Sequence, residues 1–214
     1  MEDYEIIKIT ATILALAMAI IGHEIMHGWV AYRYGDNTAK SQGRLSINPI
    51  VHIDPVGSIL VPALLYFSGA PFLFGWAKPV PVYMPTVLRN GGTNGAVAVA
   101  LAGVTYNLAL AGIFASILPM LLEPQSIVGV FFTMFIFQSI IINVLLAVFN
   151  LIPVPPLDGA NAVTYLAMGW KLDGVVRFYE KIYPYGMIFI IIILATPIKD
   201  ILFSPVSWII KFLL

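Results

Sequence analysis

Long uninterrupted blocks of apolar residues constrain this chain more than any other feature of its sequence. Of its 214 residues, 60% are hydrophobic and only 10% are charged, whereas roughly a quarter of the residues in an ordinary soluble domain are charged. A helix needs about 20 apolar residues to cross the roughly 30 Å hydrocarbon core of a bilayer. Several blocks reach that length, so the sequence predicts an integral protein of the lipid bilayer.

Two features of the composition exclude whole classes of function. The chain has no cysteine, so a metal site would have to use nitrogen and oxygen ligands. Its formal net charge is zero and its 11 basic residues are scattered, so no basic patch predicts nucleic-acid binding. The start of the chain is acidic, unlike the basic start of a secretory signal peptide. The sequence leaves the oligomeric state open.

The apolar blocks predict an all-α polytopic membrane protein, a bundle of about four to six transmembrane segments that forms one membrane-embedded domain over residues 1–214. Helices are expected at 6–32, 95–122, 127–152 and 182–198. The third of these leads into a loop that carries Asp158. An apolar tail at 201–214 is short for a crossing and is expected at the membrane interface.

Residues 33–92, after the first helix, predict a different kind of structure. The polar stretch 33–55 carries Gly, Asn, Asp and Pro around the run 39–47, which is typical of turns and strands. Residues 57–74 are apolar but are interrupted by proline and glycine, which favours a re-entrant segment over a full crossing. Residues 74–85 alternate proline with apolar residues and favour extended backbone. We therefore expect a short β-strand and re-entrant region here.

The distribution of Lys and Arg predicts the orientation of the bundle. If the first helix runs from the outside inward, 8 of the 11 basic residues lie on the cytoplasmic side, in agreement with the positive-inside bias. These residues are Arg33, Lys40, Arg44, Lys78, Arg89, Lys171, Arg177 and Lys181. The arrangement needs an even number of crossings between residues 33 and 95, which again favours re-entry. The sequence thus predicts a multi-pass protein of the cell membrane.

The first predicted helix contains the run His23-Glu24-Ile25-Met26-His27. Two histidines four residues apart project from one face of a helix, close enough to bind one zinc ion. Glu24 is rotated about 100° around the helix axis, so we expect it beside the ion, where it can accept a proton from water. Ionisable groups within a spanning helix are costly and mark function, which favours a metal site over a hydrogen-bonded core histidine.

A catalytic zinc site has three protein ligands and an open position, and Asp158 is the acidic residue best suited to be the third. Apart from Glu24, the other acids fall near the predicted outer side or in polar loops. Asp158 follows a long apolar block and is framed by Pro155, Pro156 and Gly159, where irregular backbone is expected at membrane depth. The alternative is that Asp158 caps a surface turn. One Zn²⁺ per chain is expected.

Two motifs resemble those of the site-2 protease family of intramembrane zinc metalloproteases, in its short form without PDZ or CBS domains. The first is the run at residues 23–27. The second, at 150–159, reads NLIPVPPLDG and is similar to the family pattern N-x-x-P-x-x-x-L-D-G. Residues 35–39, 43–45 and 74–82 also look like short members of the family.

The resemblance implies a function and a set of roles. His23, His27 and Asp158 would hold the zinc ion, and Glu24 would be the catalytic base. The substrates would be transmembrane segments of other proteins, often regulators whose cytosolic fragments are released in regulated intramembrane proteolysis. The active site is then expected toward the cytoplasmic side.

Three further residue types bear on this expectation. The family's G-P-x-x-N pattern appears at 103–107 as GVTYN, with Val104 in place of the proline, so any kink caused by that proline is in doubt. The resemblance implies that Asn107 and Asn150 contact substrate near the metal, with interhelical hydrogen bonding as the alternative. For His52 a turn-stabilising role is favoured over a regulatory or fourth-ligand role, because a fourth protein ligand would close the position that water needs.

The main alternative function is a membrane transporter of metal ions or protons that uses the buried His, Glu and Asp groups. Many transporters contain two similar halves, and no internal repeat is visible in this chain. A pathway should also place ionisable groups along several spans rather than at one level. A non-catalytic membrane scaffold that retains a zinc site is a second alternative, against which the intact Glu24 argues.

Overall fold

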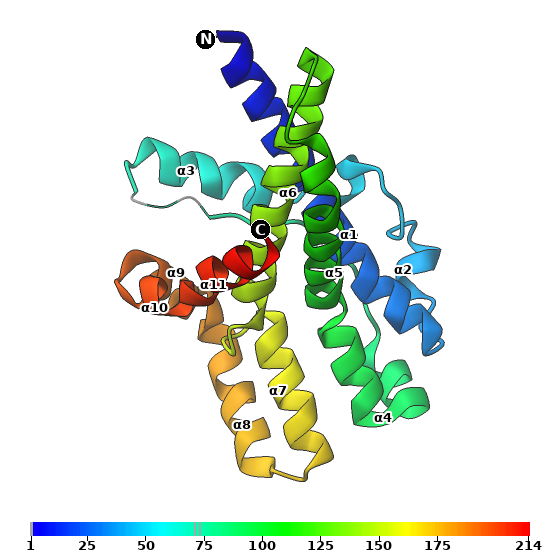
Figure 1. Ribbon diagram of the computed structural model, residues 1–214. Helices are drawn as coiled ribbons and strands as arrows, with labels where there is room; N and C mark the ends of the chain where they lie inside the picture. Colours follow the sequence, from blue (N-terminus) through cyan, green and yellow to red (C-terminus); the bar gives the residue numbers. More distant parts are fainter. Residues whose placement is uncertain (1, 71, 73) are drawn as a thin grey trace.

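The computed structural model describes residues 2–70, 72 and 74–214, and the regular structure in these ranges is helical (Figure 1). The α-helices are α1 (Glu2–Arg33), α2 (Thr38–Ser41), α3 (Val61–Phe67), α4 (Met84–Ala100), α5 (Ala102–Ile117), α6 (Ile127–Leu151), α7 (Asp158–Gly169), α8 (Asp173–Ile182), α9 (Gly186–Ala195), α10 (Ile198–Leu202) and α11 (Ser204–Leu213). Short 3-10 or π turns lie at Pro49–His52, Pro55–Leu60, Leu118–Leu121 and Tyr183–Tyr185. No described residue forms a β-strand, so the predicted strand region after the first helix is wrong.

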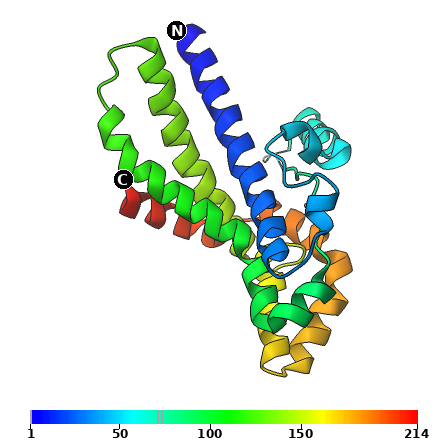
Figure 2. The same ribbon diagram turned by 90° about the vertical axis from the view of Figure 1, so that its right-hand side faces the viewer.

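Helices α1, α5 and α6 pack together at the centre of the bundle, and Figure 2 shows α4, α7 and α8 gathered at the end away from the N-terminus. Small residues allow the close approach of α1: Ala11, Ala15 and Ala19 lie one turn apart and are fully buried. In lipid, where hydrophobic burial does not drive helices together, small side chains allow close van der Waals packing. His23 and His27 continue the same four-residue spacing along α1. The packing face of α1 therefore leads directly into the histidine pair.

Among the described residues, four helical segments are long and apolar enough to cross a membrane, in agreement with a polytopic protein. They are Tyr4–Arg33, Ala102–Leu121, Ile127–Leu151 and Asp173–Ala195. The helix expected at 95–122 is divided at Leu101, whose backbone leaves the helical region with φ −94° and ψ 1°. The residues before Leu101 belong to α4. The last of the four segments begins well before residue 182, because α8 continues into α9 through a single 3-10 turn.

Side-chain caps, rather than strand pairing, organise the segment that follows α1. Within the run 39–47, α2 ends at Ser41 and the remaining residues form turns and irregular backbone. Further along, the Asn48 side chain accepts a hydrogen bond from the N–H of Ile50, and Asp54 accepts from the N–H of Gly57. Short polar side chains of this kind offer the backbone an alternative to a sheet ladder. The Gly, Asn and Asp residues of this segment end α2 and form turns, and no described residue of the segment pairs as a strand.

The apolar segment after these turns forms a short helix. Pro55–Phe67 is helical but shorter than the four candidate spans, and Figure 1 shows α3 projecting sideways from the bundle. The re-entry expected at 57–74 stays a prediction.

An extended segment, residues 74–83, runs beside α1 and is called the strap below. The N–H groups of alternate strap residues donate hydrogen bonds to the rest of the protein. These bonds join Trp76 to the Gly57 carbonyl (3.1 Å), Lys78 to the His52 carbonyl (2.9 Å) and Val80 to the Glu24 carboxylate (2.8 Å). The backbone is extended, as its prolines predict. Because the acceptors belong to helical turns and to a side chain, rather than to a neighbouring strand, the strap joins no sheet.

Asp36 fastens the end of the strap to the end of α1. Gly35 has φ 86°, a left-handed conformation that favours glycine after a helix, and it turns the buried Asp36 inward. The Asp36 carboxylate accepts hydrogen bonds from the N–H of Tyr83 (2.7 Å) and the N–H of Thr38 (2.9 Å). Burial opposes its ionisation, but these bonds and one from the Thr38 hydroxyl outweigh burial and hold the pKa of Asp36 below its ordinary value.

Replacing Asp36 should destabilise the protein in a pH-dependent way. Asp36→Ala removes charge-assisted hydrogen bonds, so the free energy of unfolding in detergent should fall by about 1.5–3 kcal/mol at pH 7. Because the folded pKa is lowered, this contribution is present above the unfolded pKa of about 3.9 and is lost as the pH falls through the folded pKa. The gap between wild type and Asp36→Ala should therefore be constant from neutral pH to about 5 and shrink below about 4. Asp173→Ala, at an exposed position, is the control; a gap that is the same at pH 3 and pH 7 would contradict a role for the ionised carboxylate.

Candidate metal centre

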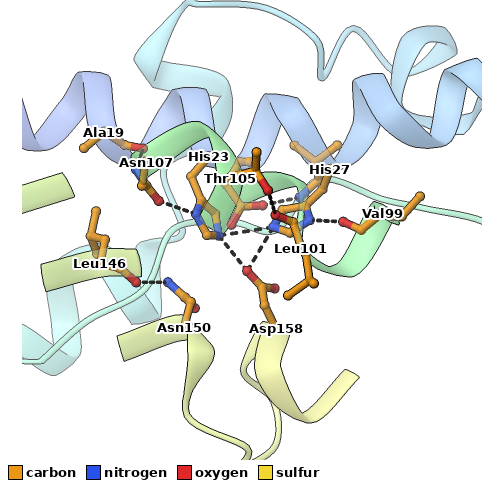
Figure 3. A network of polar contacts seen from close by, with 12 residues as sticks. Ala19, His23, His27, Val99, Leu101, Thr105, Asn107, Leu146, Asn150 and Asp158 are labelled. Atoms are coloured by element: carbon orange, nitrogen blue, oxygen red, sulfur yellow. Dashed lines mark hydrogen bonds and ion pairs between the residues drawn. The ribbon is translucent and has the colours of Figure 1, made fainter. Parts of the chain in front are cut away.

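Three side chains predicted to bind metal converge inside the bundle (Figure 3). The Nε2 atoms of His23 and His27, both on α1, lie 3.1 Å apart. Oδ2 of Asp158, the first residue of α7, lies 3.1 Å from Nε2 of His23 and 3.3 Å from Nε2 of His27. All three side chains are largely shielded, with 8%, 13% and 13% of their surface exposed for His23, His27 and Asp158. The structure thus brings Asp158 to two histidines that precede it by more than half of the chain.

The second nitrogen of each imidazole fixes its tautomer. Nδ1 of His27 lies 2.7 Å from the Val99 carbonyl oxygen, and Nδ1 of His23 lies 2.7 Å from Oδ1 of Asn107. Both oxygens only accept hydrogen bonds, so each Nδ1 carries a proton, and in the neutral imidazole Nε2 then presents a lone pair. Partners of this kind orient metal-binding histidines in proteins. The two imidazoles are therefore arranged as ligands before any ion arrives.

This donor set fits a zinc ion. Two lone pairs and a carboxylate oxygen face one another at 3.1–3.3 Å, and Oδ2 of Asp158 is buried without a hydrogen-bond donor among the described residues. Such a group of acceptors is unfavourable unless a cation or proton lies among them. Bonds of 2.0–2.2 Å to a tetrahedral zinc ion would place the ligand atoms roughly 3.3–3.6 Å apart, close to the distances here. Three ligands leave a fourth position open.

Asp158 reaches the histidines because the chain turns sharply after α6. Gly159 packs so tightly against the end of α6 that a Cβ atom there would lie 2.2 Å from the Leu151 carbonyl oxygen. Asp158 begins α7, and its side chain is largely shielded rather than at the surface. Its Oδ2 lies within 3.3 Å of both imidazoles, which does not fit the alternative of a cap on a surface turn.

Glu24 shares a cavity with the three convergent groups. The cavity has a volume of about 770 Å³, and its wall includes Trp76, Pro79 and Val80 of the strap and Asn150 of α6. Oε2 of Glu24 accepts the 2.8 Å hydrogen bond from the N–H of Val80, and Glu24 is not one of the three convergent residues. It therefore flanks the centre, with one oxygen held by the strap.

The two asparagines predicted to contact substrate occupy different environments. Asn150 lines the cavity, and its Nδ2 donates to the Leu146 carbonyl on its own helix at 3.0 Å. Asn107 is fully buried and is not part of the cavity wall. Its hydrogen bonds are made to the protein, including His23, so these contacts give no support to substrate binding by Asn107.

His52 and Val104 also have clear structural settings. His52 is 3% exposed, its Nε2 donates to the Ser46 carbonyl at 2.8 Å, and its own carbonyl accepts from Lys78. These contacts fit a turn-stabilising residue, and His52 does not join the convergent group. Val104 is the third residue of α5. In the first turn of a helix either valine or proline is tolerated, so the departure at this position leaves the helix intact.

Sequence reasoning missed three contacts around the histidines. Two are direct contacts: the Val99 carbonyl with His27, and Gly103, where a Cβ atom would lie 2.4 Å from Cε1 of His23. The third is one step away, because Asn143 of α6 accepts a hydrogen bond from Asn107. A backbone carbonyl cannot be recognised from the residue type. Asn143 could have been noticed, because an amide inside a long apolar helix is unfavourable to bury unless it has a hydrogen-bond partner.

Comparisons with known proteins identify a family model and several relatives that this chain resembles. The model of peptidase family M50 matches residues 119–194, a range that contains Asp158. YwhC of Bacillus subtilis, named as a candidate zinc metalloprotease, is 34% identical over 201 residues, covering 90% of this chain and 84% of YwhC. Two proteins with the same kind of name are Rip2 of Mycolicibacterium smegmatis, 27% identical over 197 residues (91% of this chain, 71% of Rip2), and MJ0611 of Methanocaldococcus jannaschii, 31% identical over 176 residues (81% and 79%). No solved structure matches the chain.

The close contact at Gly103 gives a test of the metal centre. Gly103→Ala would place a methyl group within 2.5 Å of three atoms of the His23 ring and displace that ring, so zinc binding should weaken about 10–100-fold. Gly112→Ala is a matched control on the same helix, because a Cβ atom there meets nothing within 4 Å. It should leave zinc affinity unchanged. Competition with a chromophoric chelator measures both, and equal affinities for the two variants would contradict the seating of His23 on Gly103.

Proposed function

The chain belongs to peptidase family M50, the site-2 protease family of zinc metalloproteases, and we propose that it cleaves peptide bonds in or near transmembrane segments of other membrane proteins. The observation that carries this proposal is the convergence of His23, His27 and Asp158 within the helical bundle. His23 and His27 belong to a helix that is long and apolar enough to span a membrane. A catalytic centre at that depth is suited to a substrate that is itself embedded in lipid.

One zinc ion per chain would be held by His23, His27 and Asp158. A bound zinc ion supplies Lewis-acid chemistry, polarising a carbonyl group and making water more acidic. The chain's contribution is to hold two imidazoles in the ligand tautomer and to keep the carboxylate of Asp158 free of other donors.

Glu24 is proposed as the general acid and base of the reaction. It is adjacent to His23 on α1 and faces the same cavity, but it does not belong to the ligand group. The hydrogen bond from the Val80 N–H fixes Oε2 and leaves the other oxygen to take a proton from the attacking water. Glu24 then delivers that proton to the leaving amine.

The substrate must be locally unwound for this reaction, because a helical peptide bond is shielded by its own hydrogen bonds. The strap supports this step: it is extended, its alternate N–H groups are tied to the rest of the protein, and Gly75, Ala77 and Pro79 line the cavity. Extended backbone beside a binding site can pair with an extended peptide. We propose that the strap receives the unwound segment, as part of regulated intramembrane proteolysis.

The protein is a membrane protein by its family and by the four long apolar helices in the described part of the chain. We propose that it lies in the cell membrane with the metal centre toward the cytoplasm. The predicted inward placement of 8 of 11 basic residues supports this orientation. His23 and His27 lie in the second half of α1, toward the end that carries Arg33.

The transporter alternative finds less support in the arrangement of buried groups. A pathway for ions needs ionisable groups at several depths. Among the described residues, the candidate metal ligands form one cluster at one level, and the buried polar residues around it on α5 and α6 are amides and a serine. Uptake of metal ions into proteoliposomes would be the sign of transport.

Glu24→Gln should abolish proteolysis without removing zinc. The amide cannot accept the water proton, so the rate of cleavage should fall about 10²–10⁴-fold, while the three ligands remain. The assay uses a tagged single-span membrane protein reconstituted with the enzyme in liposomes, with zinc measured by elemental analysis. Glu180→Gln, at an exposed position of α8, is the control. Undiminished cleavage by Glu24→Gln would contradict the role of Glu24 as the general base.

Asp158→Ala should lose zinc as well as activity. Wild-type protein should retain about one zinc ion per chain after dialysis against a weak chelator, and the variant should retain far less because two histidines alone hold zinc poorly. Elemental analysis of protein in detergent gives the ratio. A ratio near one in Asp158→Ala would remove Asp158 as a ligand, and Asp173→Ala controls for loss of an acidic side chain elsewhere.

A further inference from the structure

A chain of buried hydrogen bonds leads from α6 through α5 to the metal centre. Nδ2 of Asn143 donates to the Ser139 carbonyl (2.8 Å), Nδ2 of Asn107 donates to Oδ1 of Asn143 (2.7 Å), and Oδ1 of Asn107 faces Nδ1 of His23 (2.7 Å). Asn143, Asn107 and Ser139 are all 0% exposed. The catalytic scheme above uses neither Asn143 nor Ser139. Burying two amides in an apolar bundle is costly unless both are hydrogen-bonded, so the arrangement calls for an explanation.

The direction of every hydrogen bond in the chain follows from its far end. The Ser139 carbonyl can only accept, so it is met by Nδ2 of Asn143, and Oδ1 of Asn143 must then face Asn107. Nδ2 of Asn107 donates to that oxygen and also to the Ala19 carbonyl, at 3.2 Å. Its Oδ1 is left for His23. An amide oxygen there requires the proton on Nδ1 and the lone pair on Nε2, the nitrogen that faces Asp158.

Without Asn143, this orientation would be weakly determined. The Asn107 amide would keep one fixed acceptor, the Ala19 carbonyl, on a bond that is the longest of the set. Turning the amide over would present Nδ2 to His23 and favour the opposite tautomer, in which the proton occupies Nε2 and blocks ligation. Asn143 opposes that inversion because its own oxygen cannot donate.

We propose that Asn143 is a positioning residue for the metal centre: it sets the orientation of the Asn107 amide, which in turn holds His23 in the tautomer that binds metal. The proposal rests on the proposed ligand role of His23. The simpler explanation is that Asn143 only joins α5 to α6, as interhelical amides do in membrane proteins. The two explanations differ in what they predict. A joining role affects the stability of the metal-free protein, whereas a positioning role affects zinc affinity in protein that is still folded.

The decisive variant is Asn143→Leu, which keeps the branched shape of the side chain, removes its polar atoms and suits the apolar surroundings. Zinc affinity, measured on metal-free protein in detergent by competition with a chromophoric chelator, should weaken about tenfold, at the low end of the 10–100-fold range for residues that orient ligands. The thermal transition of the metal-free variant should stay close to that of wild type. Zinc affinity equal to wild type in folded Asn143→Leu overturns the proposal.

Two matched variants separate positioning from packing. Ser139→Ala removes a buried hydroxyl from the same face of α6 but keeps the carbonyl that Asn143 uses, so its zinc affinity should be unchanged. Asn143→Asp keeps an oxygen toward Asn107, and as the neutral acid it also donates to the Ser139 carbonyl, so its affinity should be close to wild type. A large loss of affinity in Asn143→Asp overturns the proposal even if the leucine variant fails to fold.

The same titrations keep this proposal distinct from the proposed function. If wild-type protein and Asn143→Leu bind zinc equally well, the proposed metal centre is retained and only the role of Asn143 is rejected. Wild-type protein that does not bind zinc overturns the metal centre itself, and the positioning role with it.

Discussion

Three proton acceptors face one another inside an apolar helical bundle, and the rest of the structure is arranged around that fact. The nitrogens of His23 and His27 and the oxygen of Asp158 lie 3.1–3.3 Å apart, an arrangement that is stable only with a positive charge among them. Water would relax such a cluster by solvating it, but here it is largely shielded. The surrounding elements must therefore hold the acceptors together and prevent them from finding other partners.

The face of α1 that packs against α5 and α6 also carries the two histidines and holds them in place. Ala11, Ala15 and Ala19 form a fully buried stripe, and the histidines extend it by two further turns at the same spacing. Alanine lets α5 and α6 approach the first part of the stripe closely. On α5 the absence of a side chain at Gly103 leaves room for the His23 ring, whose atoms would otherwise meet a Cβ at 2.4 Å. Helix packing and ligand geometry are thus one constraint rather than two.

The parts of the centre that could be predicted from sequence are those fixed by helical periodicity and by the cost of burying charge. The pairing of His23 with His27 follows from their spacing on one helix, and Asp158 was found because few acids remained that could lie at membrane depth. The strand expected at 39–47 failed because turn residues favour both strand ends and capped turns. In this segment Asn48 and Asp54 satisfy backbone N–H groups locally, so no ladder is needed.

Asn107 and Asn143 show a different limit of sequence reasoning. The sequence shows that burying an amide costs free energy, but it does not show which group the amide will bind. Only the packing of α5 against α6 brings the two side chains within 2.7 Å. For Asn107 the motif suggested an amide that meets substrate, whereas its contacts are with Ala19, His23 and Asn143. The Val99 carbonyl, which orients His27, is a main-chain group and has no residue type by which it could be recognised.

The strap positions Glu24, and the prolines of the strap determine which of its residues lies opposite that carboxylate. Glu24 is held by the main-chain N–H of Val80, a group present in every residue except proline, so the residue type of Val80 does not explain the contact. Its neighbours do: Pro79 and Pro81 have no N–H, and prolines favour the extended backbone on both sides. A shift of the strap by one residue in either direction would bring a proline to Glu24 and leave the carboxylate without its donor. The sequence Pro79-Val80-Pro81 therefore excludes both neighbouring registers beside the metal centre, and the hydrogen bond that holds the proposed catalytic base depends on Val80 lying between the two prolines.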